Sequence, residues 1–537
     1  MGSFNNIKGN NKKSLTAMKK YLKNIILLVV FGGILFASTR GVPGNPTHET
    51  INTFYYKEEG PFELSPERGR FALTFSLVED SSAQFSLPVA KFVTPDLAYK
   101  DGKYVSLFAP GVSFLVTPGY LVGKIFNAAQ VGTFAVISIF ALINALLIRA
   151  IAKKLGASDA ASTLASLVFL FATPAFSYAV TLYQHHITVF LMLSSIFILL
   201  KWRSVWPLLF VWILVAGSIP VDYPNIFMFL PIGIYALGRI FEVKKVAEGL
   251  KLNLKLAGIL TFVGILIPVA FFLWTNNLSY GDPLQLAGTL QSVKDFDEAG
   301  NPIFSFNSNK ENNGEILSQP TTKKEKTALG FFKTRNMLHG GNIQLVSNER
   351  GILWYAPIIL LGILGIPLIY KKNKQFVSLL LSIIGVNILL YTMWGDPWGG
   401  WAFGSRYLIP TYAIMSVFLA IALTEYRKKK LALVVFFILA SYSVAVNTLG
   451  ALTTNTVPPK VEAVALEPIS GRKEHYTYLR NWEFLMKNKS KSFVYQAFAK
   501  DYLTAPQYYY IITASIILVM SGQLVYLYID SRKENKK

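Results

Sequence analysis

The chain has 537 residues, of which 52% are hydrophobic, a formal net charge of +22 and no cysteine. The lack of cysteine excludes disulfides, thiolate metal sites and cysteine nucleophiles. A charge this positive is common in nucleic-acid-binding proteins, but here it must be weighed against about 12 stretches long and apolar enough to span a bilayer.

The predicted spans are, in chain order, 24–39, 129–149, 160–180, 187–202, 205–221, 224–239, 256–275, 351–370, 376–394, 406–424, 431–449 and 508–529. If the N-terminus is cytoplasmic, the cytoplasmic segments are 1–23, 149–159, 200–206, 239–255, 371–376, 425–431 and 530–537. These segments hold 27 Lys and Arg against 6 Asp and Glu, a net charge of +21, and the rest of the chain carries +1. Positive residues concentrate in cytoplasmic loops. The pattern therefore predicts a multi-pass protein of the plasma membrane with both termini in the cytoplasm, and it excludes nucleic acid as a partner.

Three external segments, 40–128, 276–350 and 450–507, are far longer than the loops that usually join packed helices, and long ordered loops tend to be functional. The apolar stretch 106–126 ends the first of them. It contains two Pro-Gly pairs, so we expect a juxtamembrane or re-entrant helix there rather than a span. The predicted parts of the chain are a transmembrane domain over 1–450, an external loop over 451–507, and a last span with a basic tail over 508–537.

The first external segment contains a run of apolar residues with charged neighbours. Phe71, Phe75 and Val78 have the spacing of one helix face, which favours a short amphipathic helix at the outer membrane surface. A short strand remains possible, because positions 71, 73, 75 and 77 are also apolar. In a helix, Glu67 would lie at the N-terminal end with Arg70 one turn away.

Glu67 is the first candidate for a catalytic group. A carboxylate can accept a proton from a hydroxyl or amine, and neighbouring guanidinium groups can hold a departing phosphate. The alternative is that Glu67 merely caps the helix and pairs with an arginine. Asp80 is the second candidate, beside Glu79. Two adjacent acids supply too few ligands to hold a divalent cation, and a solvated surface is their alternative role.

Two further groups lie where spans meet the outer surface. His185 and His186 are adjacent, so they do not share a helix face, and a hydrogen-bonding role competes with simple interfacial placement. Asp222 separates two spans with almost no loop. An acid at this depth is costly unless it is paired or solvated, which makes Asp222 a candidate for a site or a gate.

An aromatic and glycine-rich turn precedes the span at 406–424. Trp398 and Trp401 offer stacking faces, and the glycines allow close approach of a ligand, as carbohydrate sites require. Arg406 could hold a lipid phosphate at the depth of the headgroups. An aromatic belt with a snorkelling arginine is the alternative.

Five motifs in order resemble the GT-C superfamily of membrane glycosyltransferases, in particular the group of protein O-mannosyltransferases, aminoarabinose transferases and RgtA/B/C/D-like proteins. The resemblance covers roughly residues 20–450. The motifs are Pro66-Glu67-Arg68-Gly69-Arg70-Phe71-Ala72, Asp101-Gly102-Lys103-Tyr104 through Ala109-Pro110-Gly111, Asn276 through Leu284, Asn348 through Pro357, and Trp398-Gly399-Gly400 with Gly404 through Pro410.

The resemblance implies an all-α GT-C-like bundle of about 12 transmembrane helices with extracytoplasmic juxtamembrane helices. It also implies inverting transfer from a polyprenyl-phosphate-linked sugar to a glycan, lipid or protein acceptor at the extracytoplasmic membrane face, with Glu67, or else Asp80, as the carboxylate base. No cofactor or metal is required, although a divalent cation is compatible. The residues implied to bind the donor phosphate are Arg70, Lys103 and Arg406, and those implied to bind sugar or acceptor are His185, His186, Asp222, Trp398 and Trp401.

The chain departs from the family pattern at three positions. Glu67 stands where the family usually has Asp, Ser405 where it usually has Pro, and His185 where relatives often carry an acid or a single histidine. The alternative functions are a lipid-linked glycan flippase or transporter, a polysaccharide polymerase or ligase, and a non-catalytic GT-C-like scaffold. A transporter would place its ionisable residues inside the spans, and a polymerase usually carries its main loop late in the chain.

Overall fold

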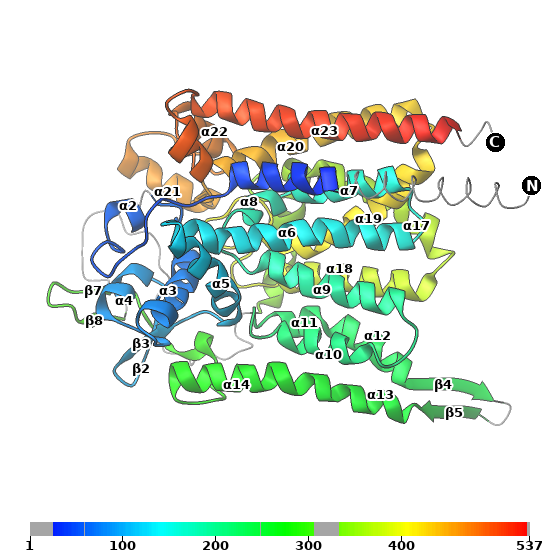
Figure 1. Cartoon of the computed structure of the whole chain (residues 1–537), viewed down its shortest axis with the longest axis horizontal. Coiled ribbons are helices and arrows are strands. Elements are labelled where there is room, and N and C mark those ends of the chain that lie inside the picture. The colour runs from blue at the N-terminus through cyan, green and yellow to red at the C-terminus, as the bar shows by residue number, and fades with distance from the viewer. Residues whose placement is uncertain (1–24, 58–59, 247–248, 305–331, 534–537) are drawn as a thin grey trace, which may run out of the picture.

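The computed structural model of the protein describes residues 25–57, 60–246, 249–304 and 332–533. The predicted cytoplasmic segment 1–23 and part of the predicted external segment 276–350 lie outside the described residues. Helices run side by side along the long axis of the molecule (Figure 1).

Each of the predicted spans contains helix. Among the described residues, six helical stretches are long and apolar enough to cross a membrane. They are α6 (Ala129–Lys154), Leu256–Tyr280 with α13 (Leu256–Leu260) and α14 (Leu266–Tyr280), α18 (Lys374–Thr392), Arg406–Tyr426 with α19 (Ile409–Tyr426), α20 (Lys430–Leu452) and α23 (Ala505–Lys533). The other predicted spans correspond to shorter apolar helices: Ile25–Ser38, α7 (Asp159–Phe171), α9 (His185–Lys201), α10 (Leu208–Gly217), α12 (Leu230–Ile240) and Pro357–Tyr370. The predicted helical membrane bundle is confirmed, and the number of 12 spans stays a prediction.

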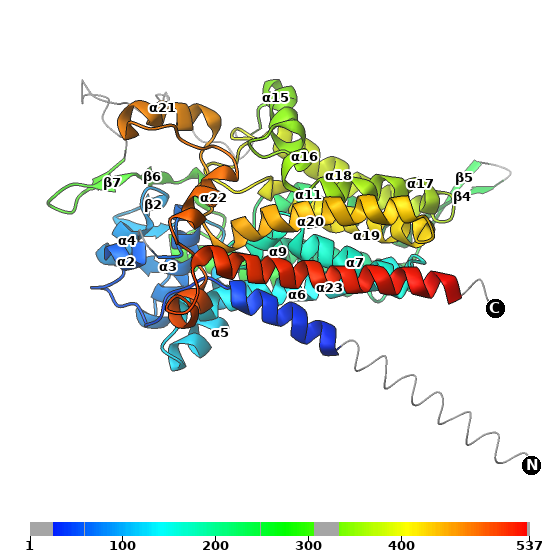
Figure 2. The same cartoon turned by 90° about the horizontal axis from the view of Figure 1, so that it is seen from above.

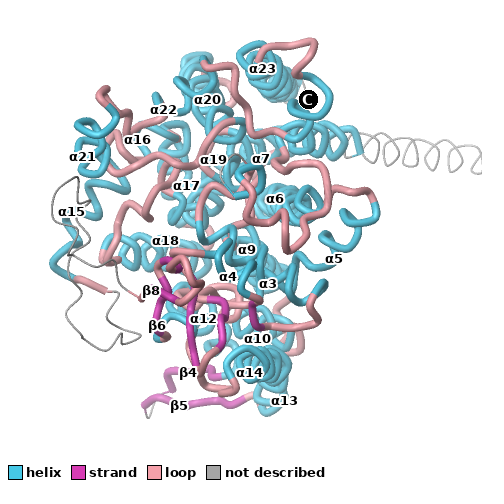
Figure 3. The backbone as a smooth tube through the Cα atoms, turned by 90° about the vertical axis from the view of Figure 1, so that its left-hand side faces the viewer, coloured by secondary structure: helices cyan, strands magenta, loops and turns pink. Residues whose placement is uncertain are grey.

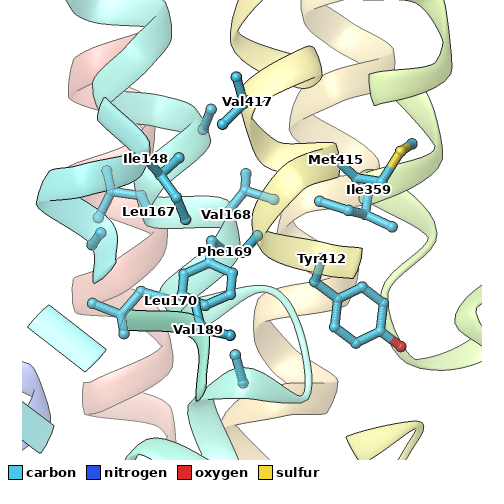
Figure 4. Packing of buried hydrophobic residues seen from close by; sticks show 14 of the residues in the cluster. Ile148, Leu167, Val168, Phe169, Leu170, Val189, Ile359, Tyr412, Met415 and Val417 are labelled. Atoms are coloured by element: carbon cyan, nitrogen blue, oxygen red, sulfur yellow. The ribbon is translucent and has the colours of Figure 1, made fainter. Parts of the chain in front are cut away.

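The centre of the bundle is formed by α7 and α19 (Ile409–Tyr426), whose side chains are buried on nearly every face. A helix that is apolar all round can be buried in a core or can face lipid, and in this bundle α7 and α19 are the buried ones. Phe169 and Leu170 of α7 and Tyr412 of α19 belong to this core (Figure 4).

The predicted juxtamembrane stretch forms α5 (Gly111–Ile125), which packs along α6. The two helices approach closely at Gly119 and Gly132. A Cβ atom on Gly132 would collide with the carbonyl oxygen of Gly119. Small residues permit such close packing between helices in a membrane.

Small sheets, which were not predicted, accompany the helices. One has the strand order β1-β3-β2-β6, formed by β1 (Gln84–Phe85), β3 (Lys103–Ser106), β2 (Leu97–Lys100) and β6 (Gln291–Val293). Antiparallel pairing of Leu97 with Val293 joins the first external segment to the second. Two shorter pairs are β4 (Phe241–Val246) with β5 (Gly249–Leu254) and β7 (Asp295–Phe296) with β8 (Pro302–Ile303).

The predicted external segments gather at one end of the bundle, on the left of Figure 1, and Figure 3 looks onto this end. The segment after α20 returns there through α21 (Lys460–Ser470) and α22 (Leu479–Met486) (Figure 2). The β4–β5 pair and the end of α23 lie at the opposite end. This separation agrees with the predicted alternation of sides, while the cytoplasmic placement of the termini and the domain boundaries stay predictions.

Candidate functional site

The helix predicted around Glu67 exists as α3 (Ser65–Glu79), which has Pro66 in its first turn, where a proline is well tolerated. The prediction of an amphipathic surface helix is wrong. All residues from Gly69 to Ser76 are buried, because α4 (Leu87–Val93) and α5 pack on different sides of the helix. A buried α3 can hold ionisable groups away from water.

Glu67 is one of these groups and is fully buried. Its Oε1 accepts a hydrogen bond from the backbone N–H of Leu182 at 3.3 Å, and its Oε2 has no partner among the described residues. Burial raises the pKa of Glu67 to about 7, against the opposing charge of Arg40. A carboxyl group with this pKa can take up and release a proton near neutral pH, as a general base must.

Arg40 is a neighbour of Glu67 that the sequence analysis missed. It is fully buried, its Nη1 lies 3.3 Å from Oε2 of Glu63, and its Nη2 donates to the carbonyl of Gly450 at 2.8 Å. The available signal was an arginine directly after the first predicted span, since a charge at that depth needs partners. Arg40 places a fixed positive charge beside the candidate base.

Arg70, Tyr183, Gln184, Asp222 and Arg406 form what we call the two-arginine cluster. The guanidinium carbons of Arg70 and Arg406 lie 5.5 Å and 5.0 Å from the ring centre of Tyr183. Nη2 of Arg70 donates to Oε1 of Gln184 at 2.7 Å, and Nε2 of Gln184 donates to Oδ2 of Asp222 at 3.0 Å. The structure thus brings together three predicted site residues and adds Tyr183 and Gln184, which the sequence analysis had not singled out.

Several hydrogen-bonding atoms in and beside this cluster are buried without a partner among the described residues. They are Nε of Arg70, Nε and Nη1 of Arg406, the hydroxyl of Tyr183 and Nε2 of His185. Buried polar groups in folded proteins nearly always have partners, so such a concentration indicates a place for a ligand. Since most of these atoms can only donate, and two arginines face one half-buried aspartate, the complementary ligand is an anion.

The pKa shifts in the cluster leave the arginines charged and the Tyr183 hydroxyl protonated, so the cluster still suits an anion. Burial raises the pKa of the Tyr183 hydroxyl, which therefore keeps its proton. Burial lowers the pKa of Arg70, and the charge of Asp222 opposes that change. The pKa of Asp222 is itself raised by burial, against the hydrogen bond from Gln184. Because arginine starts from a very high pKa, it remains positively charged.

The two histidines point to different surroundings, as the adjacent positions predicted. The His185 ring stacks on Tyr183 with 5.7 Å between ring centres and 11° between planes, which places it beside the cluster. His186 instead packs within the bundle, where its Nε2 lies 2.8 Å from the carbonyl oxygen of Ala175 and its backbone carbonyl accepts from Asn144. His185 is a candidate ligand contact, whereas the contacts of His186 lie within the bundle and its predicted part in binding stays a prediction.

The structure does not place Lys103 or Asp80 in the cluster. Lys103 is exposed in the β2–β3 pair, opposite Lys100. Asp80 caps the far end of α3, about 20 Å from Glu67 at 1.5 Å per residue, and its Oδ1 lies 2.8 Å from Nε2 of His48. Asp80 and Glu67 therefore cannot act on the same reacting atom.

The two predicted tryptophans contact other external segments. Nε1 of Trp398 donates to Oε2 of Glu349 at 2.9 Å, and Nε1 of Trp401 donates to Glu462. The turn that carries them still reaches the cluster through its backbone, because Nη2 of Arg406 donates to the carbonyl of Gly399 at 2.7 Å. The turn thus holds Arg406 in place.

Within the described ranges, no group of three or more His, Cys, Asp or Glu side chains is arranged to hold a metal ion.

Comparison with known proteins gives one structural likeness. No protein-family model and no curated protein sequence matches the chain. The chain is similar to ArnT from Cupriavidus metallidurans. The crystal structure of that protein in the apo state matches over 95% of this chain and 77% of ArnT, with a TM-score of 0.46 and 11% sequence identity. A likeness with these values gives no information about the activity of this chain.

Proposed function

We propose that this protein is a membrane glycosyltransferase. It transfers a sugar, with inversion, from a polyprenyl-phosphate donor to an acceptor at the extracytoplasmic membrane face. The observation that carries this proposal is the pairing of a buried carboxyl group of pKa about 7 with a cluster of unpartnered cationic donors at the same end of the bundle. A base and an anion site side by side are what transfer from a phosphate leaving group needs.

Glu67 and Tyr183 are linked through one short piece of backbone. Glu67 accepts the N–H of Leu182, the residue before Tyr183, and Arg70 follows Glu67 by three residues on α3, so both side chains lie on one helix face. The donor phosphate would bind to Arg70, Arg406 and the Tyr183 hydroxyl. The sugar would then lie between the phosphate and Glu67.

The reaction is a single displacement. Ionised Glu67 accepts the proton of an acceptor hydroxyl or amine as that atom bonds to the anomeric carbon. The bond from the anomeric carbon to the phosphate oxygen breaks on the opposite face, and its electron pair leaves on the polyprenyl phosphate. The two arginines stabilise this charge, so no general acid is needed for the leaving group.

The test is transfer of radiolabelled sugar by the purified full-length protein from a panel of polyprenyl-phosphate sugars. Glu67→Gln should abolish transfer, whereas Asp80→Asn, which removes one carboxylate from the other end of the same helix, should retain it. Loss of transfer in Asp80→Asn with retention in Glu67→Gln would refute the assigned base. A folded protein that binds polyprenyl phosphate but transfers no sugar from any donor would favour a flippase or a non-catalytic scaffold.

A further inference from the structure

The site described above leaves Arg350 unexplained, a residue of the motif that runs from Asn348 to Pro357. Its side chain is fully buried, and its guanidinium group donates to backbone carbonyls. Nη2 donates to Val457 at 2.7 Å and to Gly400 at 3.4 Å, and Nε donates to Trp398 at 3.3 Å. Arg350 therefore joins the turn 398–400 to the segment that follows α20.

The burial of Arg350 argues for a role in geometry. A buried arginine contributes little net stability, because the loss of hydration offsets the hydrogen bonds that it makes. An apolar side chain could fill the same volume without that loss. The planar guanidinium group differs from an apolar side chain in that it donates in several fixed directions at once. Arg350 therefore fixes the relative positions of the carbonyls that it binds, two of which belong to the turn 398–400.

The turn that Arg350 holds lies directly against Arg406 of the two-arginine cluster. Gly399, between Trp398 and Gly400 in the sequence, accepts a hydrogen bond from Nη2 of Arg406 at 2.7 Å. Gly399 has a φ of +74°, and a Cβ atom there would lie 3.0 Å from Nε of Arg406. Nε and Nη1 of Arg406 have no partner among the described residues. The turn thus supports one nitrogen of this guanidinium group and leaves the other two for an anion.

A second connection runs from Arg350 to the backbone beside Arg406. The hydroxyl of Ser405, the residue before Arg406, is buried within hydrogen-bonding distance of the carbonyl oxygens of Arg350 and of Gln344, and it lies 2.8 Å from the latter. The GT-C resemblance implies proline at this position, which has no side-chain donor. Arg350 therefore acts on the guanidinium group of Arg406 through Gly399 and on its backbone through Ser405.

The neighbouring Glu349 holds the same turn. Its buried carboxylate accepts at Oε2 from Nε1 of Trp398 at 2.9 Å and from the backbone N–H of Lys460 at 2.7 Å. Glu349 and Arg350 thus attach both the side chain and the backbone of the turn to the segment after α20.

We propose that Arg350 is a positioning residue for the donor phosphate. It fixes the turn 398–400 and Ser405, and these hold Arg406 so that Nε and Nη1 donate to the phosphate. The description of the ligand as a sugar donor rests on the glycosyl transfer proposed above. The effect of Arg350 on phosphate binding does not, and it can be measured without transfer.

The experiment is fluorescence titration of the purified full-length protein in detergent with labelled polyprenyl phosphate. The comparison ligand is the polyprenol of the same length, which lacks the phosphate. The variants are Arg350→Lys and Ser405→Ala, each made alone and together with Arg406→Gln. The matched control is Ser416→Ala, which removes a buried hydroxyl that donates to Tyr412 within α19 at 2.8 Å.

The Kd for polyprenyl phosphate should rise about fivefold or more in Arg350→Lys and about threefold or more in Ser405→Ala. It should stay unchanged in Ser416→Ala, and the affinity for polyprenol should not change in any of the variants. Since lysine keeps the positive charge, the loss in Arg350→Lys reports geometry. In the Arg406→Gln background, neither substitution should weaken binding further, because the side chain through which it acts is already removed.

A pair of glycine substitutions tests the turn independently of Arg350. Both Gly399 and Gly400 have positive φ, so alanine is strained at either position. A Cβ atom at Gly399 meets Arg406, whereas one at Gly400 lies no closer than 3.8 Å to its nearest neighbour. Gly399→Ala should therefore weaken polyprenyl phosphate more than Gly400→Ala does, at similar melting temperatures.

Several results would overturn the proposal. Wild-type binding by Ser405→Ala with a lowered melting temperature would assign this link to stability alone. Weakening by the same factor with and without Arg406→Gln would show that the effect does not pass through Arg406. If Arg350→Lys fails to fold, Ser405→Ala and the glycine pair decide the question.

The positioning proposal and the proposed function fail in different ways. Polyprenyl phosphate binding without sugar transfer refutes only the enzyme. Binding and transfer that are normal in Arg350→Lys and Ser405→Ala refute only the positioning role. Lack of polyprenyl phosphate binding by the wild type would overturn both, because Arg406 would then hold no phosphate.

Discussion

The substitution Glu67→Gln tests both the chemistry and the electrostatics of the site. The amide keeps the shape of the carboxyl group but cannot take the proton, and loss of a general base typically costs about 10²–10⁴ in rate. The wild-type rate should also follow ionisation of Glu67. With a pKa of about 7, roughly a tenth of the carboxyl is ionised at pH 6 and nine tenths at pH 8, so transfer should rise about tenfold over this interval.

Folding stability should fall as the pH rises, whereas the transfer rate should increase. The folded-state pKa of Glu67 is raised from 4.5 to about 7, and a tenfold change in proton affinity is worth about 1.4 kcal/mol, so the total is about 3 kcal/mol. Since the raised pKa means that the folded protein holds the proton more tightly than the unfolded chain, folding stability is full below pH 4.5. It falls as the pH rises to about 7. Glu67→Gln should therefore melt at a higher temperature than wild type at pH 8, with the advantage disappearing at pH 4.5.

The test is to measure sugar transfer and thermal melting in detergent, each from pH 4.5 to pH 8. Asp80→Asn serves as the control, because its carboxyl group is half-buried at the far end of α3 and pairs with His48. A wild-type rate that is flat with pH would refute Glu67 as the base. A melting difference between Glu67→Gln and wild type that is the same at both ends of the range would refute the raised pKa.

Two further predictions concern the anion site and the packing. Arg406→Gln should weaken polyprenyl phosphate binding about tenfold or more, because it removes a buried charge-assisted donor, while Arg335→Gln, an exposed arginine on the same face, should leave binding unchanged in a flotation or fluorescence assay. Gly132→Ala should destabilise the protein by about 1–3 kcal/mol, because its Cβ would meet the backbone of Gly119. Gly385→Ala, with nothing within 4 Å, should be neutral or slightly stabilising in a melting assay, and equal effects of the two substitutions would contradict the close packing of α5 on α6.

Much of the helical architecture was predictable because a bilayer imposes a simple requirement. A span must satisfy its backbone internally and present an apolar surface, so runs of hydrophobic residues mark the helices directly. The charge count separated the two ends of the bundle for a similar reason. The hydrophobic pattern does not tell which helices lie at the centre of the bundle. α7 and α19 are the central helices, yet their apolar sequences do not differ in kind from those of the peripheral spans.

The candidate site was predictable only in part, because it depends on contacts between distant segments. Asp222 was selected because an acid at the membrane boundary is costly without a partner, Arg406 because it could hold a phosphate at headgroup depth, and Arg70 because it lies near Glu67. Nothing in the sequence indicated that Tyr183 and Gln184 would connect them. Lys103 was chosen from a motif, but its position in the β2–β3 pair, which the sequence analysis did not predict, leaves it exposed to solvent.

The contacts of Arg40 have a consequence for biosynthesis. Its side chain donates to the carbonyls of Gly450 and Ala451 and to Asn455, more than 400 residues later in the chain. At ordinary translation rates of about 5–20 residues per second, these partners are made roughly 20–80 s after Arg40 itself. During that time Arg40 can pair with Glu63, which is made soon after it, but the contacts with the segment after α20 cannot form. Completion of the surroundings of Glu67 therefore waits for the segment that follows α20, and a chain terminated before residue 450 lacks three of the hydrogen bonds of Arg40.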